Sequence, residues 1–245
     1  MFGVKLSVRC VAAVLLTAAV VGGTVKAEAQ STSTERRTRR ESSANRRARI
    51  ARTVQDTYSH RWEVAGGGGY LRFKPGTILQ KNDEVTFWMT GTYYLNSRFG
   101  IIGEVRGAYG NAKVGNTFPA FLPFNPQISE YPFMGGVAYR LYAKEKLAVS
   151  VTGEGGAALG KSDDGAKGLT SADLGLWQST TKPVFAIGAN FDYNFYPNLA
   201  FRVSPTYMPT FYRLDPTDTT HGSAGSIQNN FGVNVGVVYR FGRIK

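Results

Sequence analysis

From Val85 to Phe241 the chain alternates with a period of two between apolar and polar residues, which is typical of β-strands whose two faces meet different surroundings. Seven segments share this pattern: 85–95, 99–109, 131–141, 147–157, 185–195, 199–211 and 231–241. Their 43 odd-numbered positions carry no charged side chain, although 19% of the whole chain is charged. The even-numbered positions between them hold the charges. The alternation predicts strands with one apolar face and one polar face.

An eighth segment, Arg61–Phe73, precedes these seven and follows the pattern less closely. Trp62 and Val64 alternate with Glu63, but four glycines then occupy positions 66–69. Glycine is weak in strand interiors, yet small residues suit the wall of a tight barrel. The glycines do not form a phosphate-binding loop, because neither a lysine nor a helix pattern follows them. We expect this segment to be the first strand.

The connections between the eight segments alternate between short and long. The short ones are 96–98, 142–146 and 196–198, and the long ones are 74–84, 110–130, 158–183 and 212–230. This alternation indicates an antiparallel meander with turns at one end and loops at the other, and predicted strands of about 10–13 residues suit a tilted crossing of a bilayer. The predicted fold is all-β: a closed, eight-stranded, up-and-down transmembrane barrel with short periplasmic turns and long extracellular loops.

The polar face carries both signs of charge, which a narrow barrel interior accommodates only as paired, hydrogen-bonded groups. We expect eight residues to form such an ion network: Glu63, Glu104, Arg106, Arg140, Glu154, Asp192, Arg202 and Arg240. A soluble barrel would turn its apolar face inward instead. Aromatic residues near the strand ends of the apolar face, such as Trp62, Tyr139 and Phe241, are typical of membrane interfaces and favour lipid on the outside.

The first 29 residues resemble a secretory signal peptide. Lys5 and Arg9 precede an uncharged run over 10–23, and Ala27-Glu28-Ala29 supplies a cleavage site. The alternative is an uncleaved anchor, although a run of about 14 residues is short for a membrane helix, which needs about 20. Cys10 is the only cysteine of the chain, so cleavage is expected to leave no disulfide and no thiol nucleophile.

The segment 30–60 is strongly basic, and we expect an unstructured periplasmic tail. Glu35–Arg52 holds eight arginines against two glutamates and supplies +6 of the formal charge of +12. A basic run alone would suggest nucleic acid, but the export signal argues against that partner. Anionic lipid or a cell-wall polymer, bound through Arg36–Arg52, is the expected alternative partner.

The last predicted strand ends in Asn234-Val235-Gly236-Val237-Val238-Tyr239-Arg240-Phe241. With the alternating segments over 61–241, this ending resembles the OmpA/OmpX-type eight-stranded outer-membrane β-barrel family. The resemblance implies outer-membrane lipid around the barrel of a Gram-negative bacterium, and recognition of Asn234, Gly236, Tyr239 and Phe241 by the barrel-assembly machinery. The short tail 242–245 departs from the family pattern, in which the final aromatic usually ends the barrel or the chain. An ordinary amphipathic strand is the alternative interpretation.

No arrangement of residues predicts catalysis, a cofactor or a metal site. His60 lies before the first strand and His221 in the last long loop, whereas a Ser-His-acid site needs a histidine on a rigid wall. Asp163-Asp164 fits a loop tip better than a calcium site. We therefore expect no enzyme, although some small outer-membrane barrels modify lipids.

Three functions remain open at this point. The preferred one is a structural or surface-interaction barrel whose loops face the exterior, with ligand contacts expected in 110–130 and 158–183. The second is a narrow porin-like channel constricted by the ion network, and the third is a lipid-modifying enzyme. One conflict also stands: Pro205 and Pro209 each remove a backbone donor inside the seventh strand, which requires a bulge or a strand rising beyond the membrane.

Overall fold

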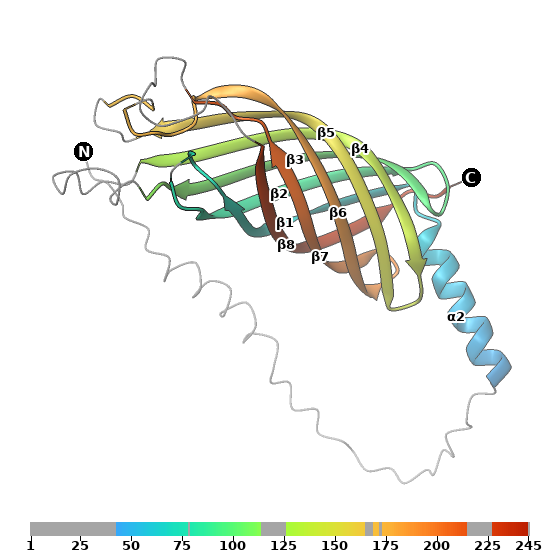
Figure 1. The fold of residues 1–245 in the computed structure, drawn as a ribbon. Helices are drawn as coiled ribbons and strands as arrows, with labels where there is room; N and C mark the ends of the chain where they lie inside the picture. Colours follow the sequence, from blue (N-terminus) through green and yellow to red (C-terminus); the bar gives the residue numbers. More distant parts are fainter. Residues whose placement is uncertain are drawn as a thin grey trace, which may run out of the picture. The chain divides into compact units, whose positions relative to one another are not determined.

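The computed structural model describes residues 43–77, 79–113, 126–164, 169–171, 173–214 and 227–244. The predicted leader 1–29 and His221 lie outside this part. Its elements are α2 (Ser43–Tyr58), β1 (Trp62–Phe73), β2 (Asn82–Tyr94), β3 (Phe99–Asn111), β4 (Gln127–Ala143), β5 (Leu147–Asp164), β6 (Thr180–Tyr196), β7 (Leu199–Thr210) and β8 (Gln228–Phe241) (Figure 1). Among the described residues, no helix has both the length and the apolar character needed to span a membrane.

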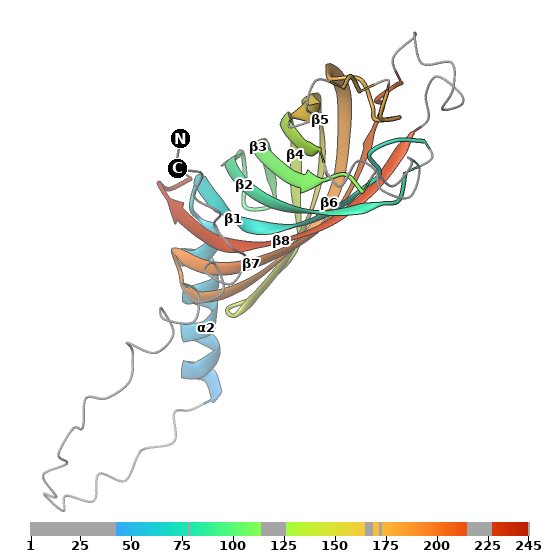
Figure 2. The same cartoon turned by 90° about the vertical axis from the view of Figure 1, so that its left-hand side faces the viewer.

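The strands close into one barrel in the order β1 to β8, and every strand is antiparallel to both of its neighbours. Strand β8 pairs with β1 from Trp62–Phe241 to Arg72–Phe231, which completes the ring (Figures 1 and 2). The predicted all-β, up-and-down, eight-stranded architecture is confirmed. We call the end with the short connections 95–98, 144–146 and 197–198 the turn end, and the opposite end the loop end.

The predicted apolar face points outward. Val85, Met89 and Ile187 are each more than 60% exposed, while Glu84 and Arg202 on the other face are buried. Of the 43 charge-free positions only Gly107 is buried, because the ring of Phe87 covers it. The parity of each strand therefore places apolar groups outside and polar groups inside, as the alternation predicts.

Most strands extend further toward the loop end than expected, and β4, β5 and β6 extend furthest. Strand β4 begins at Gln127, β5 continues to Asp164 and β6 begins at Thr180, so the predicted loops 110–130 and 158–183 are shorter than expected. Asp163-Asp164 therefore ends a strand and is not a loop tip. Beyond the exposed Leu159, the outward residues of these extensions include the polar Gln127, Lys161 and Thr181. Apolar alternation marks only the part of a strand that faces an apolar medium, which is why it underestimates the strand lengths.

Residues 43–58 form helix α2, although segment 30–60 was expected to be unstructured. The alanines and arginines of this stretch are good helix formers. The last residue of the helix, Tyr58, is only 5% exposed because it packs against the barrel. Packing of this kind stabilises a helix that composition alone leaves marginal.

Strand β7 is continuous through Pro205 and Pro209. Both prolines pair with β8, opposite Val233 and Asn229. On the other side, the ladder with β6 includes Tyr207 and Thr210 but skips both prolines. The missing backbone donors thus weaken only the β6–β7 ladder, and no wide break in the strand is needed.

The glycines of β1 allow close packing where the barrel closes. A Cβ atom on Gly67 would lie 2.0 Å from the carbonyl oxygen of Val235 in β8. The buried side chain of Trp88 packs beside this point with Ala65 and Val238. Small residues in the wall therefore make room for one large indole inside the barrel.

Candidate functional site: the barrel interior

The turn end of the interior holds a dense group of ion pairs, which we call the turn-end cluster: Glu63, Arg140, Asp192, Arg202 and Arg240. Glu63 lies opposite Arg240 in the β1–β8 register, and Asp192 lies opposite Arg202 in the β6–β7 register. Strand pairing therefore places each acid beside a base. All five side chains are almost completely buried.

Two arginines bridge the two acids of this cluster. Arg202 Nη2 lies 2.5 Å from Glu63 Oε1 and its Nε lies 2.6 Å from Asp192 Oδ1. Arg240 Nε lies 2.9 Å from Glu63 Oε2 and its Nη2 lies 2.8 Å from Asp192 Oδ2. Arg140 adds a longer contact of 3.6 Å to Glu63 and donates to the carbonyl oxygen of Ser97 at 2.6 Å. Such mutual neutralisation is the condition under which buried charges are tolerated.

Tyr58 of α2 covers the turn-end cluster. Its hydroxyl donates to the Lys144 carbonyl oxygen at 2.7 Å and accepts from Asn194 Nδ2 at 2.9 Å. The guanidinium carbons of Arg140 and Arg240 lie 4.8 and 5.8 Å from the centre of its ring, within cation–π range. Burial raises the pKa of the Tyr58 hydroxyl, although both arginines act to lower it. The helix thus closes the turn end with an aromatic side chain.

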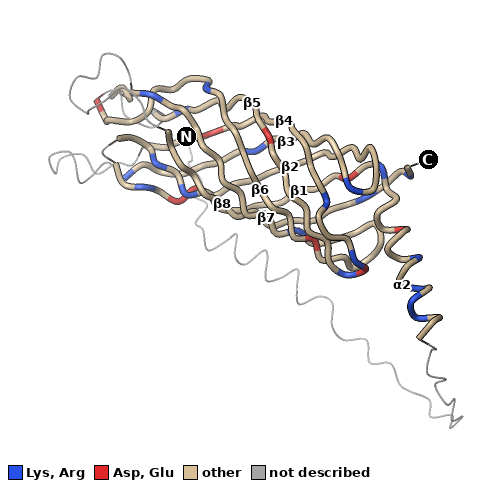
Figure 3. Tube along the Cα trace, turned by 45° about the vertical axis from the view of Figure 1, so that its right-hand side comes forward, with Lys and Arg blue, Asp and Glu red and all other residues tan. Residues whose placement is uncertain are grey.

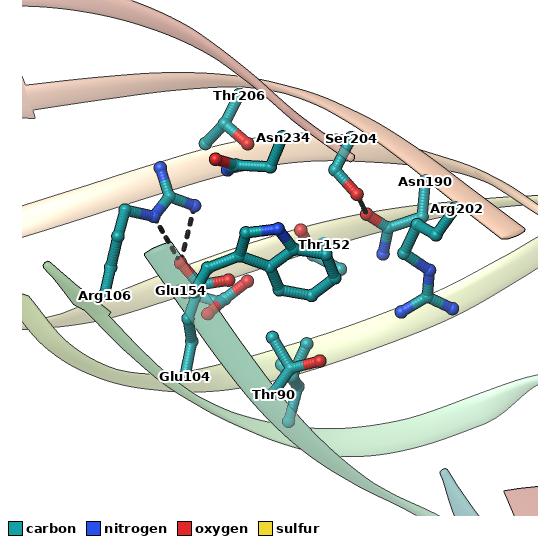
Figure 4. A pocket seen from close by; sticks show the side chains of 12 residues that line it. Thr90, Glu104, Arg106, Thr152, Glu154, Asn190, Arg202, Ser204, Thr206 and Asn234 are labelled. Carbon is teal, nitrogen blue, oxygen red and sulfur yellow. Dashed lines mark hydrogen bonds and ion pairs between the residues drawn. The ribbon is translucent and has the colours of Figure 1, made fainter. Parts of the chain in front are cut away.

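A second group lies midway along the barrel, and we call it the middle cluster: Glu104, Arg106 and Glu154 (Figure 4). Arg106 Nε donates to Glu104 Oε1 at 2.9 Å, and its Nη2 lies 2.5 Å from the same oxygen. Trp88 lines the same cavity as these three residues. The cluster forms no ion pair with the turn-end cluster among the described residues.

The middle cluster lines a cavity of about 10 Å³. Trp88 Nε1, Thr90 Oγ1 and Glu154 Oε2 are buried without hydrogen-bond partners, and all three residues line this cavity. A space of that size holds about one water molecule, which typically makes two to four hydrogen bonds. The geometry of this cavity therefore fits a single bound water molecule.

Two further buried acids, Glu84 and Glu130, lie on the inner face nearer the loop end, and we call them the acid pair. Neither acid was predicted to lie inside the barrel, because both fall at the edges of the predicted loops 74–84 and 110–130. Their spacing from Thr86 and from Pro132 continues the inward parity of β2 and β4, and this is the signal that could have identified them.

The loop end is closed by an apolar group that we call the loop-end cap: Phe73, Leu79, Leu174, Leu176, Trp177, Tyr212 and Leu214. Trp177 Nε1 donates to the carbonyl oxygen of Lys74 at 2.5 Å, and its backbone N–H donates to that of Pro75 at 3.0 Å. The ring of Phe73 meets that of Tyr212 edge to face at 6.2 Å. The 173–179 connection is thus packed into the mouth of the barrel.

The eight residues predicted to form one ion network therefore lie inside the barrel in two separate groups. Charged residues are sparse along the middle of the strands and gather toward the barrel ends and along α2 (Figure 3).

The four residues predicted as the assembly signal lie on both faces of β8. Asn234 and Gly236 face inward, and Asn234 Oδ1 accepts a hydrogen bond of 2.8 Å from the Thr86 hydroxyl. Tyr239 and Phe241 face outward at the turn end.

Aromatic rings pair on the outer face near both ends of the barrel. At the turn end Trp62 contacts Tyr93 at 4.7 Å and Phe241 at 6.5 Å between ring centres. At the loop end Tyr207 lies 4.9 Å from Phe231. Between them the surface is lined by exposed aliphatic and phenyl side chains. This distribution is typical of a surface whose two edges lie at membrane–water interfaces.

The described residues contain no group of three or more His, Cys, Asp or Glu side chains suited to a metal ion. His60 Nδ1 lies 3.1 Å from the carbonyl oxygen of Thr57, so its ring is engaged at the end of α2.

No protein-family model matches the chain. No curated protein matches it in sequence. Several solved structures are similar to it, including the following three. Neisserial surface protein A is 11% identical, with 74% of this chain and 97% of that chain covered and a TM-score of 0.48. The outer membrane protein OprG from Pseudomonas aeruginosa is 14% identical, with 76% and 98% covered and a TM-score of 0.48. Ail, the attachment invasion locus protein of Yersinia pestis, is 20% identical, with 75% and 99% covered and a TM-score of 0.42.

Proposed function

We propose that the chain is a filled, non-conducting transmembrane barrel of a Gram-negative outer membrane, with a structural or surface-interaction role. In this proposal the leader 1–29 directs export, the turn end faces the periplasm and the loop end faces the exterior. The observation that carries the proposal is that side chains close the interior at both ends.

Membrane insertion is supported by the outer face. Large apolar side chains such as Phe87, Ile101 and Phe185 are about half exposed on neighbouring strands all around the barrel. A continuous apolar surface of this extent is unfavourable in water and favourable in lipid. Closure of β8 onto β1 leaves no unpaired strand edge, which a membrane-spanning sheet requires.

The absence of conduction is supported by the interior. Tyr58 and the turn-end cluster fill one end, and Trp177 with the rest of the loop-end cap fills the other. Between them, the cavity at the middle cluster measures about 10 Å³. A hydrated ion needs a continuous water-filled path, and ion pairs of 2.5–2.9 Å at the turn end would have to separate to provide one.

Planar-bilayer recording of the purified protein tests this function. We expect no reproducible open state for the wild type. A steady unit conductance that Arg140→Ala or Glu154→Ala abolishes or enlarges would instead establish the porin-like channel. The lipid-modifying alternative predicts a changed lipid A mass in cells that express the protein, and an unchanged mass spectrum would remove it.

The proposed partners follow from a barrel that spans the outer membrane with its turn end in the periplasm. Outer-membrane lipid surrounds the apolar face, and the barrel-assembly machinery recognises the ending Asn234–Phe241. The exposed arginines of α2, which include Arg46 and Arg49, bind anionic lipid or a cell-wall polymer at the periplasmic side. Cosedimentation of the refolded protein with phosphatidylglycerol-containing vesicles or with peptidoglycan tests the last point, with Arg46→Gln/Arg49→Gln as the comparison.

A further inference from the structure

The acid pair differs from the other buried acids of the barrel because it has no base. The turn-end cluster sets three arginines against two acids, and the middle cluster contains Arg106. Glu84 and Glu130 are 0% and 1% exposed, and neither forms an ion pair with a described residue. All four of their carboxylate oxygens are buried without a hydrogen-bond partner.

The register brings the two acids together across β3. Thr86 lies opposite Ala108, and Ala108 lies opposite Glu130, so these three positions form one row. Glu84 is two residues from Thr86 on the same inward face. A Cβ atom on Gly110 would lie 2.7 Å from Glu84 Cγ, which shows that the Glu84 side chain lies over β3. The residues of β3 between the two acids, Ala108 and Gly110, are small.

Two further oxygen-bearing side chains reach the same place. A Cβ atom on Gly160, which pairs with Glu130, would lie 3.0 Å from the Tyr212 hydroxyl. The Asn82 amide lies over Gly110 beside Glu84 through its nitrogen Nδ2, and its oxygen Oδ1 belongs to the same planar group. Tyr212 Oη and Asn82 Oδ1 are both buried and without hydrogen-bond partners. The two carboxylates, the Asn82 amide and the Tyr212 hydroxyl therefore lie in one region, and the four carboxylate oxygens accept no hydrogen bond there.

We propose that Glu84, Glu130, Asn82 and Tyr212 form a binding site for one divalent cation of the calcium type beneath the loop-end cap. Hard divalent cations take oxygen ligands, and Ca²⁺ accepts irregular sets of six to eight of them, with water completing the shell. The set contains no nitrogen or sulfur ligand, which disfavours zinc and copper.

Protonation is the competing way to neutralise the pair, because an isolated buried carboxylate is strongly unfavourable. A protonated carboxyl, however, becomes a donor that needs an acceptor. None of the four carboxylate oxygens makes a hydrogen bond in the structure, so each added proton would also need an acceptor that the present geometry does not supply. A cation satisfies all of the oxygens at once.

Tyr212 enters this site as a neutral ligand. Burial raises the pKa of its hydroxyl well above the usual value, and the nearby Glu130 and Glu84 carboxylates raise it further. The bound ion links β2, β4 and the residue that follows β7 by two positions. It therefore ties the wall of the barrel to the loop-end cap, independently of whether the barrel conducts.

The first test measures thermal unfolding of the full chain refolded into zwitterionic detergent. CaCl₂ is compared with KCl at equal ionic strength, and folding is followed by the mobility of unboiled samples on gels. We expect Ca²⁺ to raise the unfolding midpoint of the wild type and of the control Glu154→Gln. We expect no rise for Glu84→Gln/Glu130→Gln, which folds without needing the ion because both charges are gone. A rise that persists in the double variant would assign the effect to surface acids and overturn the proposal.

The second test counts bound calcium directly after gel filtration, which does not depend on a stability change. We expect one Ca²⁺ per wild-type chain, and affinity at least tenfold weaker in Glu84→Gln or Glu130→Gln. Terbium offers the matching spectroscopic readout: its luminescence on tyrosine excitation should fall in Tyr212→Phe. If the wild type binds no Ca²⁺ and loses stability with rising pH at any calcium concentration, the pair holds protons and the proposal is wrong.

Discussion

The hydroxyl of Tyr58 donates a 2.7 Å hydrogen bond to the carbonyl oxygen of Lys144, a residue of the β4–β5 turn 86 positions further along the chain. Through this bond the end of α2 is fixed to the turn end of the barrel. The same ring contacts two arginines of the turn-end cluster. Closure of that end therefore depends on a side chain outside the strands.

Shortening Tyr58 tests this closure. Tyr58→Phe keeps the ring and loses the hydrogen bond, so we expect the free energy of unfolding to fall by about 1 kcal/mol. Tyr58→Ala also removes the packed ring and should lower it by about 3 kcal/mol. Urea unfolding of the protein in phospholipid vesicles measures both. Arg47→Ala, on the exposed face of α2, is the control and should change nothing measurable. Wild-type stability of Tyr58→Ala would show that the helix end is not docked.

Removing one acid from the turn-end cluster should be strongly destabilising. Asp192→Asn leaves Arg202 and Arg240 with Glu63 as their only nearby acid, and an uncompensated buried charge costs about 3–5 kcal/mol. The control is Asp56→Asn, because the Asp56–Arg243 pair is solvent-exposed and exposed pairs contribute little. The same vesicle unfolding assay applies. Equal effects of the two substitutions would contradict the burial of this network.

Closure of the barrel between β1 and β8 requires glycine at several positions, and the approach is tightest at Gly67. Gly67→Ala places a methyl group 2.0 Å from the Val235 carbonyl oxygen, and we expect a loss of about 1–3 kcal/mol or more from the forced backbone shift. Gly103→Ala is a matched control, because nothing lies within 4 Å of its added Cβ. The fraction that migrates as folded barrel on unboiled gels reports the difference. A folded fraction of Gly67→Ala equal to that of Gly103→Ala would refute the close approach.

Alkaline pH should weaken the docking of α2. The pKa of Tyr58 in the folded protein is raised above its ordinary value of 10.0. The protonated hydroxyl therefore contributes fully to stability below about pH 10, and this contribution is lost as the pH rises through the pKa of the folded state. We expect the unfolding midpoint in urea to fall less between pH 9 and pH 11 in Tyr58→Phe than in the wild type. Parallel pH profiles would contradict a buried, protonated Tyr58.

The wall of the barrel could be predicted from the sequence because strand parity is a local property. Glu104 and Arg106 differ by two positions on one strand, so alternation alone places both inside. The pairing of Glu63 with Arg202 could not be predicted, because the two residues are 139 positions apart in the chain. Whether they meet depends on how far the strands around the barrel are staggered relative to one another. The sequence could suggest a charged interior but not its division into two clusters.

The features at both ends of the barrel were missed for a different reason. Glu84 and Glu130 lie where the outward residues become polar, so the apolar signal stops before the strand does. Tyr58 and Trp177 belong to a helix and a connection whose positions depend on contacts with distant turns. Such contacts carry no periodic signal in the chain. The resolution of the proline conflict likewise needed the register, because only the β6–β7 ladder omits Pro205 and Pro209.

The most direct test of a lipid-facing barrel is spin-label accessibility along β2 in vesicles. Cys10→Ser removes the only cysteine, and single cysteines at 86, 87, 89 and 90 then carry the nitroxide. For a lipid-facing barrel we expect a period of two: labels at 87 and 89 collide with oxygen but not with a water-soluble nickel chelate, and labels at 86 and 90 collide with neither. High accessibility to the nickel chelate at 87 and 89 would mean that the apolar face meets water, and it would contradict the transmembrane barrel.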